Sequence, residues 1–178
     1  MNKAVFLDRD GVINEVKTKR VKFVNHPDQF HFLEKVPEAL KLLDQSGFKL
    51  FVVTNQGGVG LGYLSKQELG KIHDYMMNEI QRLTGVEIEE VACCIHKPHE
   101  GCTCRKPEPG MINDLAKKYA IDIAKSYMIG DRVMDIEAGK KAGCQTVLIS
   151  NRPRVDFEVD FIYPSLYEAA TFITKSGK

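Results

Sequence analysis

The sequence reads AVFLDRDGVIN over residues 4–14, where four apolar residues end abruptly in two acids, Asp8 and Asp10, and a glycine. A short apolar run of this kind is typical of a buried strand in a parallel sheet. Ligands of such sheets bind beyond the carboxyl ends of the strands, so both acids are expected at a binding site. An ordinary polar turn is the competing interpretation, because Asp and Gly are common in turns.

Strand and helix patterns alternate along the rest of the chain. Strands are expected at residues 4–7, 48–53, 91–95, 127–129, 146–149 and 161–162, and helices after Pro37, from Ser65 to Gly85, and at 109–119, 135–142 and 166–174. The helix that follows Ser65 begins with a capping box, Ser65-Lys66-Gln67-Glu68. Its expected apolar face comprises Leu69, Ile72, Met76, Ile80 and Leu83. This alternation predicts an α/β fold with a three-layer, doubly wound, mainly parallel sheet.

Length and composition point to one ordinary globular domain that spans residues 1–178. The chain is 43% apolar and 28% charged, with a net charge of +1, which shows no bias toward nucleic acid or membranes. No apolar stretch approaches the roughly 20 residues that cross a bilayer, and Met1-Asn2-Lys3 leads directly into the first strand without a signal peptide. A cytoplasmic location is therefore expected.

Polar and acidic residues follow three of the predicted strands. Asp8 and Asp10 follow the first, Thr54 and Asn55 the second, and Asp131 the strand at 127–129. Parallel strands all point the same way, so these side chains are expected to converge at one edge of the sheet. That convergence favours an active site over an isolated polar turn.

The expected cluster suits phosphoryl transfer. Acids that share one edge repel one another unless a cation lies among them, and Mg²⁺ binds oxygen ligands and commonly bridges carboxylates to phosphate. Thr54, Asn55 and Lys106 offer groups for the phosphoryl oxygens, as positioning and charge neutralisation require. Asp8 is the available nucleophile, and its attack on phosphorus would form an aspartyl phosphate. Asp10 is close enough to act as general acid and base.

Four ordered motifs resemble those of the haloacid dehalogenase superfamily, and the resemblance extends over roughly residues 3–150. They are Asp8-Arg9-Asp10-Gly11-Val12-Ile13-Asn14, Val53-Thr54-Asn55-Gln56-Gly57, Cys104-Arg105-Lys106-Pro107 and Ile129-Gly130-Asp131-Arg132. The first and third are similar to those of the branch that contains the heptose bisphosphate and histidinol-phosphate phosphatases.

The resemblance implies a role for each matching residue. Asp8 would be the nucleophile and Asp10 the general acid and base. Mg²⁺ would be bound by the Asp8 carboxylate, the Asp10 backbone carbonyl and Asp131. Thr54 and Lys106 would stabilise the phosphoryl group, and Asp135 would orient Lys106 or a water at the metal rather than bind the metal. Substrate contacts are expected from Asn55, Gln56, Arg105 and Arg132.

A second metal site is expected in the loop at about residues 94–104. Cys94-Ile95-His96 and Cys102-Thr103-Cys104 offer four soft ligands in two close pairs, a pattern suited to one structural, tetrahedral Zn²⁺. The same branch of phosphatases carries this ligand set. Cys93 is expected to face the other side of its strand, while His99 is an alternative to His96. Chance clustering of core cysteines is the other interpretation.

The segments at residues 15–28 and 56–65 are too short for a large cap domain, so the site is expected to be open, which suits either a sizeable substrate or one held by the loops. A small sugar phosphate is the expected substrate. The 7-phosphate of D-glycero-D-manno-heptose 1,7-bisphosphate is the first choice and histidinol phosphate the alternative. Four cations lie together beside the expected site, where they would form a solvated loop or bind a second anionic group: Lys17, Lys19, Arg20 and Lys22.

Two other classes of function compete with this prediction. A polynucleotide 3′-phosphatase could use the basic loop together with Arg152 and Arg154, although aromatic residues do not alternate with the cations. A non-catalytic zinc-binding module would leave the polar strand ends unexplained. We therefore expect a small-molecule partner and neither nucleic acid nor membrane. No sequence feature decides the oligomeric state, and a monomer is compatible with the sequence.

Overall fold

The computed structural model describes residues 1–176 and contains one six-stranded sheet whose strands are all parallel. The strand order is β3-β2-β1-β4-β5-β6. The strands are β1 (Lys3–Leu7), β2 (Phe48–Asn55), β3 (Glu90–Cys94), β4 (Tyr127–Gly130), β5 (Gln145–Ile149) and β6 (Phe161–Tyr163). The predicted doubly wound α/β fold is confirmed.

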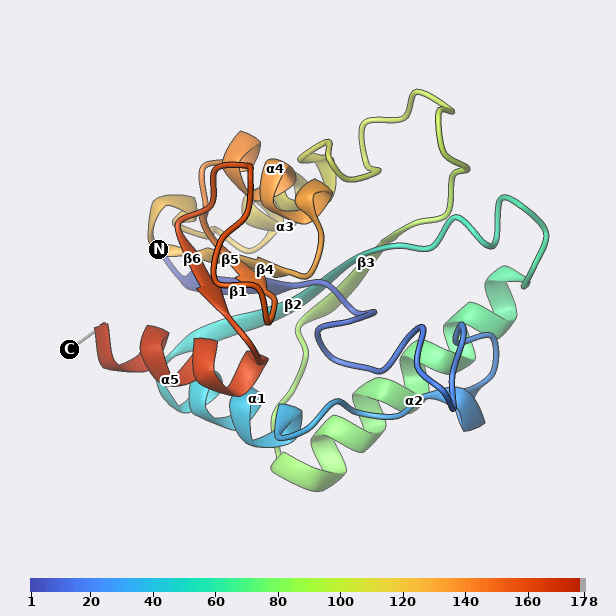
Figure 1. The fold of residues 1–178 in the computed structure, drawn as a ribbon, viewed down its shortest axis with the longest axis horizontal. Helices are drawn as coiled ribbons and strands as arrows, with labels where there is room; N and C mark the ends of the chain where they lie inside the picture. Colours follow the sequence, from blue (N-terminus) through green and yellow to red (C-terminus); the bar gives the residue numbers. More distant parts are fainter. Residues whose placement is uncertain (177–178) are drawn as a thin grey trace.

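Helices cover both faces of this sheet (Figure 1). The helices are α1 (Val36–Gln45), α2 (Lys66–Thr84), α3 (Gly110–Lys118), α4 (Val133–Ala142) and α5 (Leu166–Ser176), with short 3₁₀ turns at Pro27–Gln29 and Ile123–Lys125. One core lies between the sheet and α1, α2 and α5, and a second lies between the sheet and α3 and α4. The result is the expected three-layer arrangement.

The alternation of side chains along β1 explains how one strand serves both cores. Val5 and Leu7 belong to the core under α1, α2 and α5, whereas Ala4 and Phe6 belong to the core under α3 and α4. All four side chains are completely buried. A central strand of a parallel sheet is covered on both faces, which is why its apolar run is continuous rather than alternating.

The beginning and end of α2 follow the sequence signals. Ser65 Oγ accepts a hydrogen bond from the Glu68 N–H, and Gly85 ends the helix with a left-handed backbone. Leu69, Ile72, Met76 and Ile80 are buried as expected. The assignment of Leu83 to the buried face was wrong, because this residue is exposed near the helix end.

The predicted end of the second strand was also wrong. Thr54 and Asn55 belong to β2 and pair with Cys93 and Cys94 of β3, instead of following the strand. Two polar residues at the end of a strand look like the start of a loop in the sequence, but pairing with β3 extends the ladder through them.

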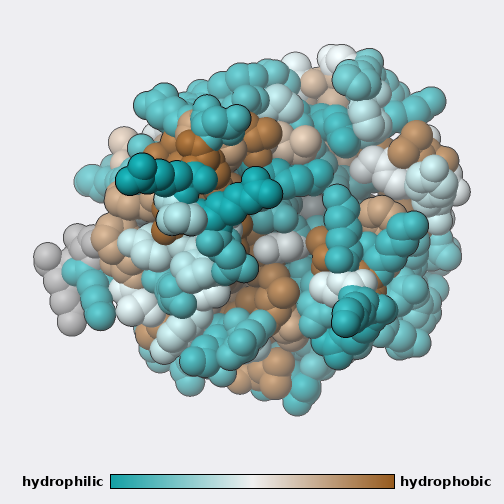
Figure 2. Space-filling view, viewed as in Figure 1, coloured by the Kyte–Doolittle hydropathy of each residue, from teal (hydrophilic) through white to brown (hydrophobic). Residues whose placement is uncertain are grey.

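The surface is mainly hydrophilic on the face shown in Figure 2, with smaller hydrophobic areas between the polar side chains. No helix within the described residues is long and apolar enough to cross a membrane.

Two glycines offer a test of helix packing. A Cβ atom at Gly139 of α4 would lie 2.6 Å from the Met128 Cβ atom on β4, whereas Gly70 of α2 has open space around it. Gly139→Ala should therefore lower the free energy of unfolding by about 1–3 kcal/mol, since the helix must move away from the sheet. Gly70→Ala should raise it by roughly 0.5–1 kcal/mol, because alanine favours a helix interior. Urea unfolding measures both changes, and equal effects of the two substitutions would contradict this description of the packing.

Candidate active site

The carboxyl ends of β1, β2 and β4 meet at one edge of the sheet. Leu7 is aligned with Val52 of β2 and with Ile129 of β4, and the Asp8 N–H donates to the Ile129 carbonyl at 2.9 Å. The residues that follow this common level are Asp8, Thr54 and Asp131. The parallel register therefore gathers polar side chains that lie far apart in the sequence.

Lys106 is the central cation of this cluster. Its Nζ atom lies 2.8 Å from Asp8 Oδ1 and 2.7 Å from Asp135 Oδ1, and it donates to the Val53 carbonyl at 2.8 Å. The side chain is almost completely buried. Burial alone would lower the pKa of Lys106, but the charges of Asp8 and Asp135 raise it above its ordinary value. The lysine is thus a buried ammonium ion with three oxygen partners.

The acidic residues carry more negative charge than Lys106 balances. Burial raises the pKa of Asp8 to about 7, with further upward contributions from Asp135 and Asp10 that oppose the effect of Lys106. Burial and the charge of Asp135 also raise the pKa of Asp131. Carboxylate oxygens of Asp8, Asp131 and Asp135 lie within 4.8 Å of one another. Such a group of acids is stable as carboxylates when a cation is bound among them.

Unpaired oxygens indicate where such a cation fits. Asp8 Oδ2 and Asp131 Oδ1 are buried and have no hydrogen-bond partner among residues 1–176. Buried polar atoms are nearly always satisfied, so these two oxygens lack a partner that the chain itself does not supply. A hard divalent cation with a preference for oxygen ligands fits this donor set.

Gly11 allows Asp131 to approach the first motif. The backbone at Gly11 has φ +85°, a left-handed conformation that favours glycine, and an added Cβ atom would overlap the Asp131 carboxylate. The turn around Gly11 is closed by the Arg9 carbonyl, which accepts from the N–H groups of Ile13 and Asn14. A side chain at Gly11 would therefore displace one of the three clustered acids.

Asp10 points into a separate set of hydrogen-bond donors. Its carboxylate accepts from Asn14 Nδ2 at 2.9 Å, from Gln56 Nε2 at 3.1 Å and from the Arg9 guanidinium at 3.0 Å. Burial alone would raise the pKa of Asp10, but the charge of Arg9 and these hydrogen bonds lower it below its ordinary value. Asp8 and Asp10 are two residues apart, yet their environments move their pKa values in opposite directions.

The polar residues at the end of β2 connect these groups. Gln56 Nε2 also donates to Thr54 Oγ1 at 2.9 Å, and Thr54 is almost fully buried. Asn55 accepts from the Lys106 N–H and donates to the Lys106 carbonyl, each at 3.0 Å. In this structure Asn55 holds the lysine backbone, whereas its expected contact with the phosphoryl oxygens stays a prediction.

The two arginines expected at the site make different contacts. Arg105 Nη1 donates to the His96 carbonyl at 3.2 Å, so this side chain lies against the cysteine-containing loop. Arg132 is exposed, and its backbone N–H donates to Asp135 Oδ2 at 3.0 Å. Substrate contacts of either arginine stay predictions.

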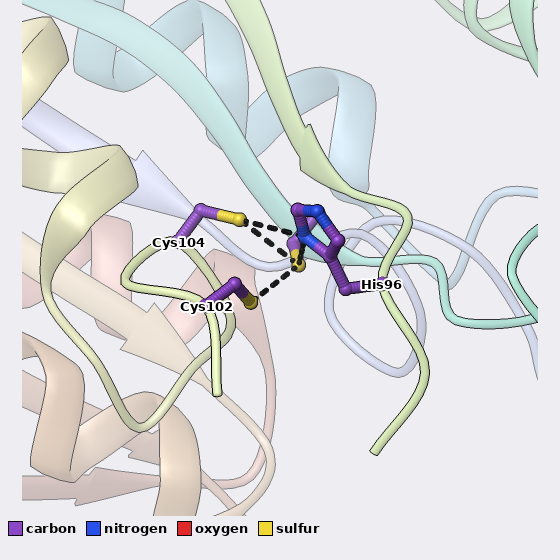
Figure 3. Close-up of side chains that lie close together, drawn as sticks. His96, Cys102 and Cys104 are labelled. Carbon is purple, nitrogen blue, oxygen red and sulfur yellow. Dashed lines mark hydrogen bonds between the residues drawn. The ribbon is translucent and has the colours of Figure 1, made fainter. Parts of the chain in front are cut away.

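Four side chains of the cysteine-containing loop converge as the sequence pattern predicted (Figure 3). Potential ligand atoms of Cys94, His96, Cys102 and Cys104 lie within 4.8 Å of one another. His96 Nδ1 is 3.3 Å from Cys94 Sγ and 3.2 Å from Cys104 Sγ, and the Sγ atoms of Cys94 and Cys104 are 3.1 Å apart. Three soft sulfur ligands and one imidazole nitrogen suit tetrahedral Zn²⁺.

Two residues near this cluster in the sequence, Cys93 and His99, do not belong to it. Cys93 packs on the opposite face of the sheet, toward the core that contains α2, as the alternation of a strand requires. His99 is exposed, has a positive φ of 66°, and is not part of the ligand group. The structure thus brings together the set with His96 and not the alternative with His99.

The cysteine-containing loop is tied to the active-site edge. The Gln56 N–H donates to the Cys94 carbonyl at 2.7 Å, and the Gly60 N–H donates to the Ile95 carbonyl at 3.0 Å. Cys104 is followed at once by Arg105 and Lys106. The loop therefore positions both the segment that contains Gln56 and the buried lysine.

The basic loop is exposed beside this edge. Lys17 and Lys22 are joined by a backbone hydrogen bond of 3.0 Å, which folds the segment into a tight turn. Arg20 forms an ion pair with Glu15 at 2.7 Å. Part of the positive charge of the loop is therefore neutralised within the chain.

Arg9, Asn14 and His73 were not selected as site residues from the sequence. Asn14 and Arg9 contact Asp10, and His73 contacts Arg9. The position of Arg9 between two acids was the available signal, because a basic residue there can form an ion pair with either neighbour. Nothing in the sequence near His73 connects it with the first motif.

Comparison with known proteins gives a consistent set of relatives. A Hydrolase-like family model, described as HAD-hydrolase-like, matches residues 103–169. A D-glycero-beta-D-manno-heptose-1,7-bisphosphate 7-phosphatase from Haemophilus ducreyi is 35% identical over an alignment 182 positions long, which covers 96% of this chain and 98% of that protein. A D-glycero-alpha-D-manno-heptose-1,7-bisphosphate 7-phosphatase from Photorhabdus laumondii is 38% identical over 148 residues and 79% of this chain, with 78% of that protein covered.

A solved structure supports the same relationship. The D,D-heptose 1,7-bisphosphate phosphatase from B. bronchiseptica, crystallised with magnesium and phosphate, is 31% identical to this chain. The superposition has a TM-score of 0.86 and covers 98% of this chain and 99% of that one. The similarity therefore extends over nearly the whole described fold.

Removal of the buried lysine should destabilise the metal-free protein. Lys106→Met leaves Asp8 and Asp135 buried without their cation, which should cost about 3–5 kcal/mol of unfolding free energy at neutral pH. Carboxyl groups with a raised pKa in the folded state bind protons that the unfolded chain has released. The loss of unfolding free energy in Lys106→Met should therefore grow as pH rises from about 4 to 7.

Urea unfolding in the presence of a chelator measures this loss at several pH values. Lys118→Met is the matched control, because Lys118 forms an equally short but exposed ion pair, 2.6 Å from Glu90. The control should change stability little. Equal effects of the two substitutions, or a deficit that shrinks as pH rises, would contradict the assignment of Lys106 as the essential buried cation.

Proposed function

The chain belongs to the heptose-1,7-bisphosphate 7-phosphatase family of haloacid dehalogenase-like hydrolases, and we propose that it hydrolyses the 7-phosphate of D-glycero-D-manno-heptose 1,7-bisphosphate. The observation that carries the proposal is the pairing of Asp8 Oδ1 with Lys106 at 2.8 Å while the other Asp8 oxygen is buried without a partner. Lys106 thereby holds the Asp8 carboxylate in place, and Asp8 Oδ2 has no partner among the described residues. The relatives with this substrate in their names cover nearly the whole chain.

The acidic cluster is proposed to bind Mg²⁺. The Asp8 and Asp131 carboxylates and the Asp10 backbone carbonyl would supply the protein ligands, consistent with the two buried oxygens that lack partners. The related structure from B. bronchiseptica contains magnesium and phosphate. When bound, Mg²⁺ neutralises negative charge on the phosphoryl group and on the carboxylates.

In the first step, an Asp8 carboxylate oxygen forms a bond to phosphorus as the bond from phosphorus to the sugar oxygen breaks. The bonding electrons leave with the sugar oxygen, which receives a proton from Asp10 and departs as an alcohol. Lys106 stabilises the transferring phosphoryl group by its positive charge, and Thr54 by its hydroxyl. The products of this step are the free alcohol and an aspartyl phosphate at Asp8.

In the second step, Asp10 removes a proton from water, which attacks phosphorus and releases inorganic phosphate from Asp8. The ionised state that Arg9, Asn14 and Gln56 favour for Asp10 suits this role as a base. For the first step Asp10 must carry a proton, and the approach of a negatively charged phosphate raises its affinity for one. The same residue therefore serves both steps in opposite protonation states.

Cys94, His96, Cys102 and Cys104 are proposed to bind a structural Zn²⁺. Support comes from the close approach of their four ligand atoms and from the lack of an open position in a site with four protein ligands. A fixed loop would keep Arg105 and Lys106 at the phosphate, because they directly follow Cys104. The expected effect of zinc on activity is thus indirect, through the placement of these two residues.

The remaining site residues are proposed to select the substrate. Arg105 precedes Lys106 and Arg132 follows Asp131 in the chain, and the exposed cations of the basic loop could attract a second phosphate. The relatives include enzymes named for the alpha anomer and for the beta anomer. We propose a small phosphorylated sugar as the partner, with neither nucleic acid nor membrane involved, and a cytoplasmic site of action.

Steady-state kinetics with both candidate substrates test the proposed function. With Mg²⁺ present, we expect a higher kcat/KM for the heptose bisphosphate than for L-histidinol phosphate, with 7-phosphate as the group released. A specificity constant that is higher for histidinol phosphate would contradict the proposed substrate while leaving the phosphatase chemistry in place.

Asp8→Asn is the control for the chemistry. An amide of the same shape removes the nucleophile, so turnover of both esters should fall by at least about 10⁴-fold, to the level of contaminating activity. The fold should persist, because the substitution also removes one repulsive charge from the acidic cluster. Substantial phosphatase activity in this variant would rule out the covalent route.

Zinc content provides the test of the second metal site. Protein purified without added metal should contain about one equivalent of zinc, and Cys102→Ser should weaken zinc binding by more than about tenfold. Activity should fall as the zinc is lost, since Arg105 and Lys106 are then less well placed. Elemental analysis and phosphatase assays measure these two quantities on the same samples.

Cys93→Ser is the matched control, since Cys93 precedes a proposed ligand but faces the opposite core. It should retain zinc at the level of the unaltered protein. Less than about half an equivalent of zinc in active, unaltered protein would refute the site, as would equal zinc loss in the two variants.

A further inference from the structure

Arg9 is a buried cation within the first motif, and in the proposed mechanism it serves only to favour the ionised state of Asp10. Its side chain is only 1% exposed although it lies between Asp8 and Asp10 in the sequence. A buried guanidinium is tolerated when its hydrogen bonds and charge are satisfied. The partners of Arg9 therefore indicate what this residue does at the site.

The guanidinium is shared between two partners on different elements. Its Nε and Nη2 atoms donate to Asp10 Oδ1 at 3.1 and 3.0 Å, and Nη2 also lies 3.3 Å from Asp10 Oδ2. Its third nitrogen, Nη1, lies 3.1 Å from Nε2 of His73, a residue of α2 that is itself buried. Each nitrogen of the Arg9 guanidinium thus has a partner, and contacts with Asp10 and His73 fix the orientation of the group.

The contact defines the protonation state of His73. An arginine only donates hydrogen bonds, so His73 Nε2 must accept, and a neutral ring then carries its proton on Nδ1. The burial of His73 and the charge of Arg9 agree with this state, because they lower its pKa to about 4. His73 is therefore an uncharged acceptor at neutral pH.

We propose that His73 is a positioning residue for the general acid and base, which it serves by holding Arg9 against the Asp10 carboxylate. This inference rests on the proposed function, since it assigns a purpose to the orientation of Asp10. Asn14 and Gln56 bind the same carboxylate from other directions. With His73 in place, Arg9 completes a rigid set of donors that aims Asp10 at the leaving oxygen.

Loss of this anchor should affect proton transfer more than phosphoryl binding. Without an acceptor at position 73, the Nη1 end of Arg9 has no partner and the guanidinium can rotate away from its present position. Asp10 would then sample several orientations, which lowers the rate of a step that depends on its alignment with the leaving oxygen. Asp8 and Lys106 are not in this hydrogen-bonded chain and should keep their places.

Esters with different leaving groups distinguish an effect on proton transfer from an effect on phosphoryl binding. A sugar alkoxide must be protonated as it leaves, whereas p-nitrophenolate is stable enough to leave without a proton. His73→Leu, which removes the acceptor at similar bulk, should lower kcat/KM for the best sugar phosphate about tenfold or more. For p-nitrophenyl phosphate the decrease in kcat/KM should be about twofold, because this constant does not depend on the later hydrolysis of the aspartyl phosphate.

Two further variants complete the experiment. His73→Gln places an amide oxygen near the position of Nε2 and should restore most of the lost activity toward the sugar phosphate. Ile80→Ala, on the same helix and in the core, should destabilise the protein without changing the ratio of activities toward the two esters. An equal decrease for both esters in His73→Leu, or the same change of ratio in Ile80→Ala, would overturn the inference.

A measurement on the unaltered protein covers the case in which His73→Leu does not fold. Nitrogen-15 NMR should find the His73 ring neutral at neutral pH, with Nδ1 protonated and Nε2 accepting, and a ring protonated on Nε2 would overturn the inference. If the unaltered enzyme hydrolyses neither ester, the proposed function fails and this inference with it. If it hydrolyses both and the variant leaves their ratio unchanged, the inference alone fails.

Discussion

One buried ammonium group, Lys106 Nζ, balances carboxylates that come from the end of β1 and from the start of α4. Its distances of 2.8 Å to Asp8 and 2.7 Å to Asp135 are those of direct ion pairs, and both acids are buried with it. Such charges are costly away from water unless they are paired, so the positions of all three depend on one another. The lysine fixes one oxygen of Asp8 and leaves the other without a partner among the described residues, in a group of acids whose carboxylate oxygens lie within 4.8 Å of one another.

The placement of Lys106 depends in turn on two features outside the acidic cluster. Asn55, at the end of β2, binds both the N–H and the carbonyl of Lys106 and thereby sets its backbone. The four-residue cysteine and histidine cluster ends at Cys104, two residues earlier, and its loop is bonded to Gln56 and Gly60. A metal ion held by this cluster would therefore affect catalysis through the position of Lys106, without contact with the substrate.

Much of this arrangement could be predicted from the sequence, because it follows from local patterns. The apolar residues before Asp8, Thr54 and Asp131 indicated the fold class and the common edge. The spacing of the three cysteines and His96 indicated the second cluster. The Arg9–His73 contact could not be predicted, since it joins residues 64 positions apart through the packing of α2. The hydrogen bonds of Asn55 with Lys106 also could not be predicted. The sequence does not show that the donor and acceptor of this amide are used within the chain rather than by a phosphate.

Covalent catalysis at Asp8 is the central claim, and chemical trapping of the phosphorylated enzyme tests it most directly. Rapid quenching during turnover, followed by borohydride reduction and peptide mass spectrometry, identifies the residue that carries an acyl phosphate. The account predicts conversion of Asp8 to homoserine, dependent on substrate and Mg²⁺, with Asp10 unmodified. Modification of a different residue, or rapid turnover with no modified protein at any quench time, would contradict it.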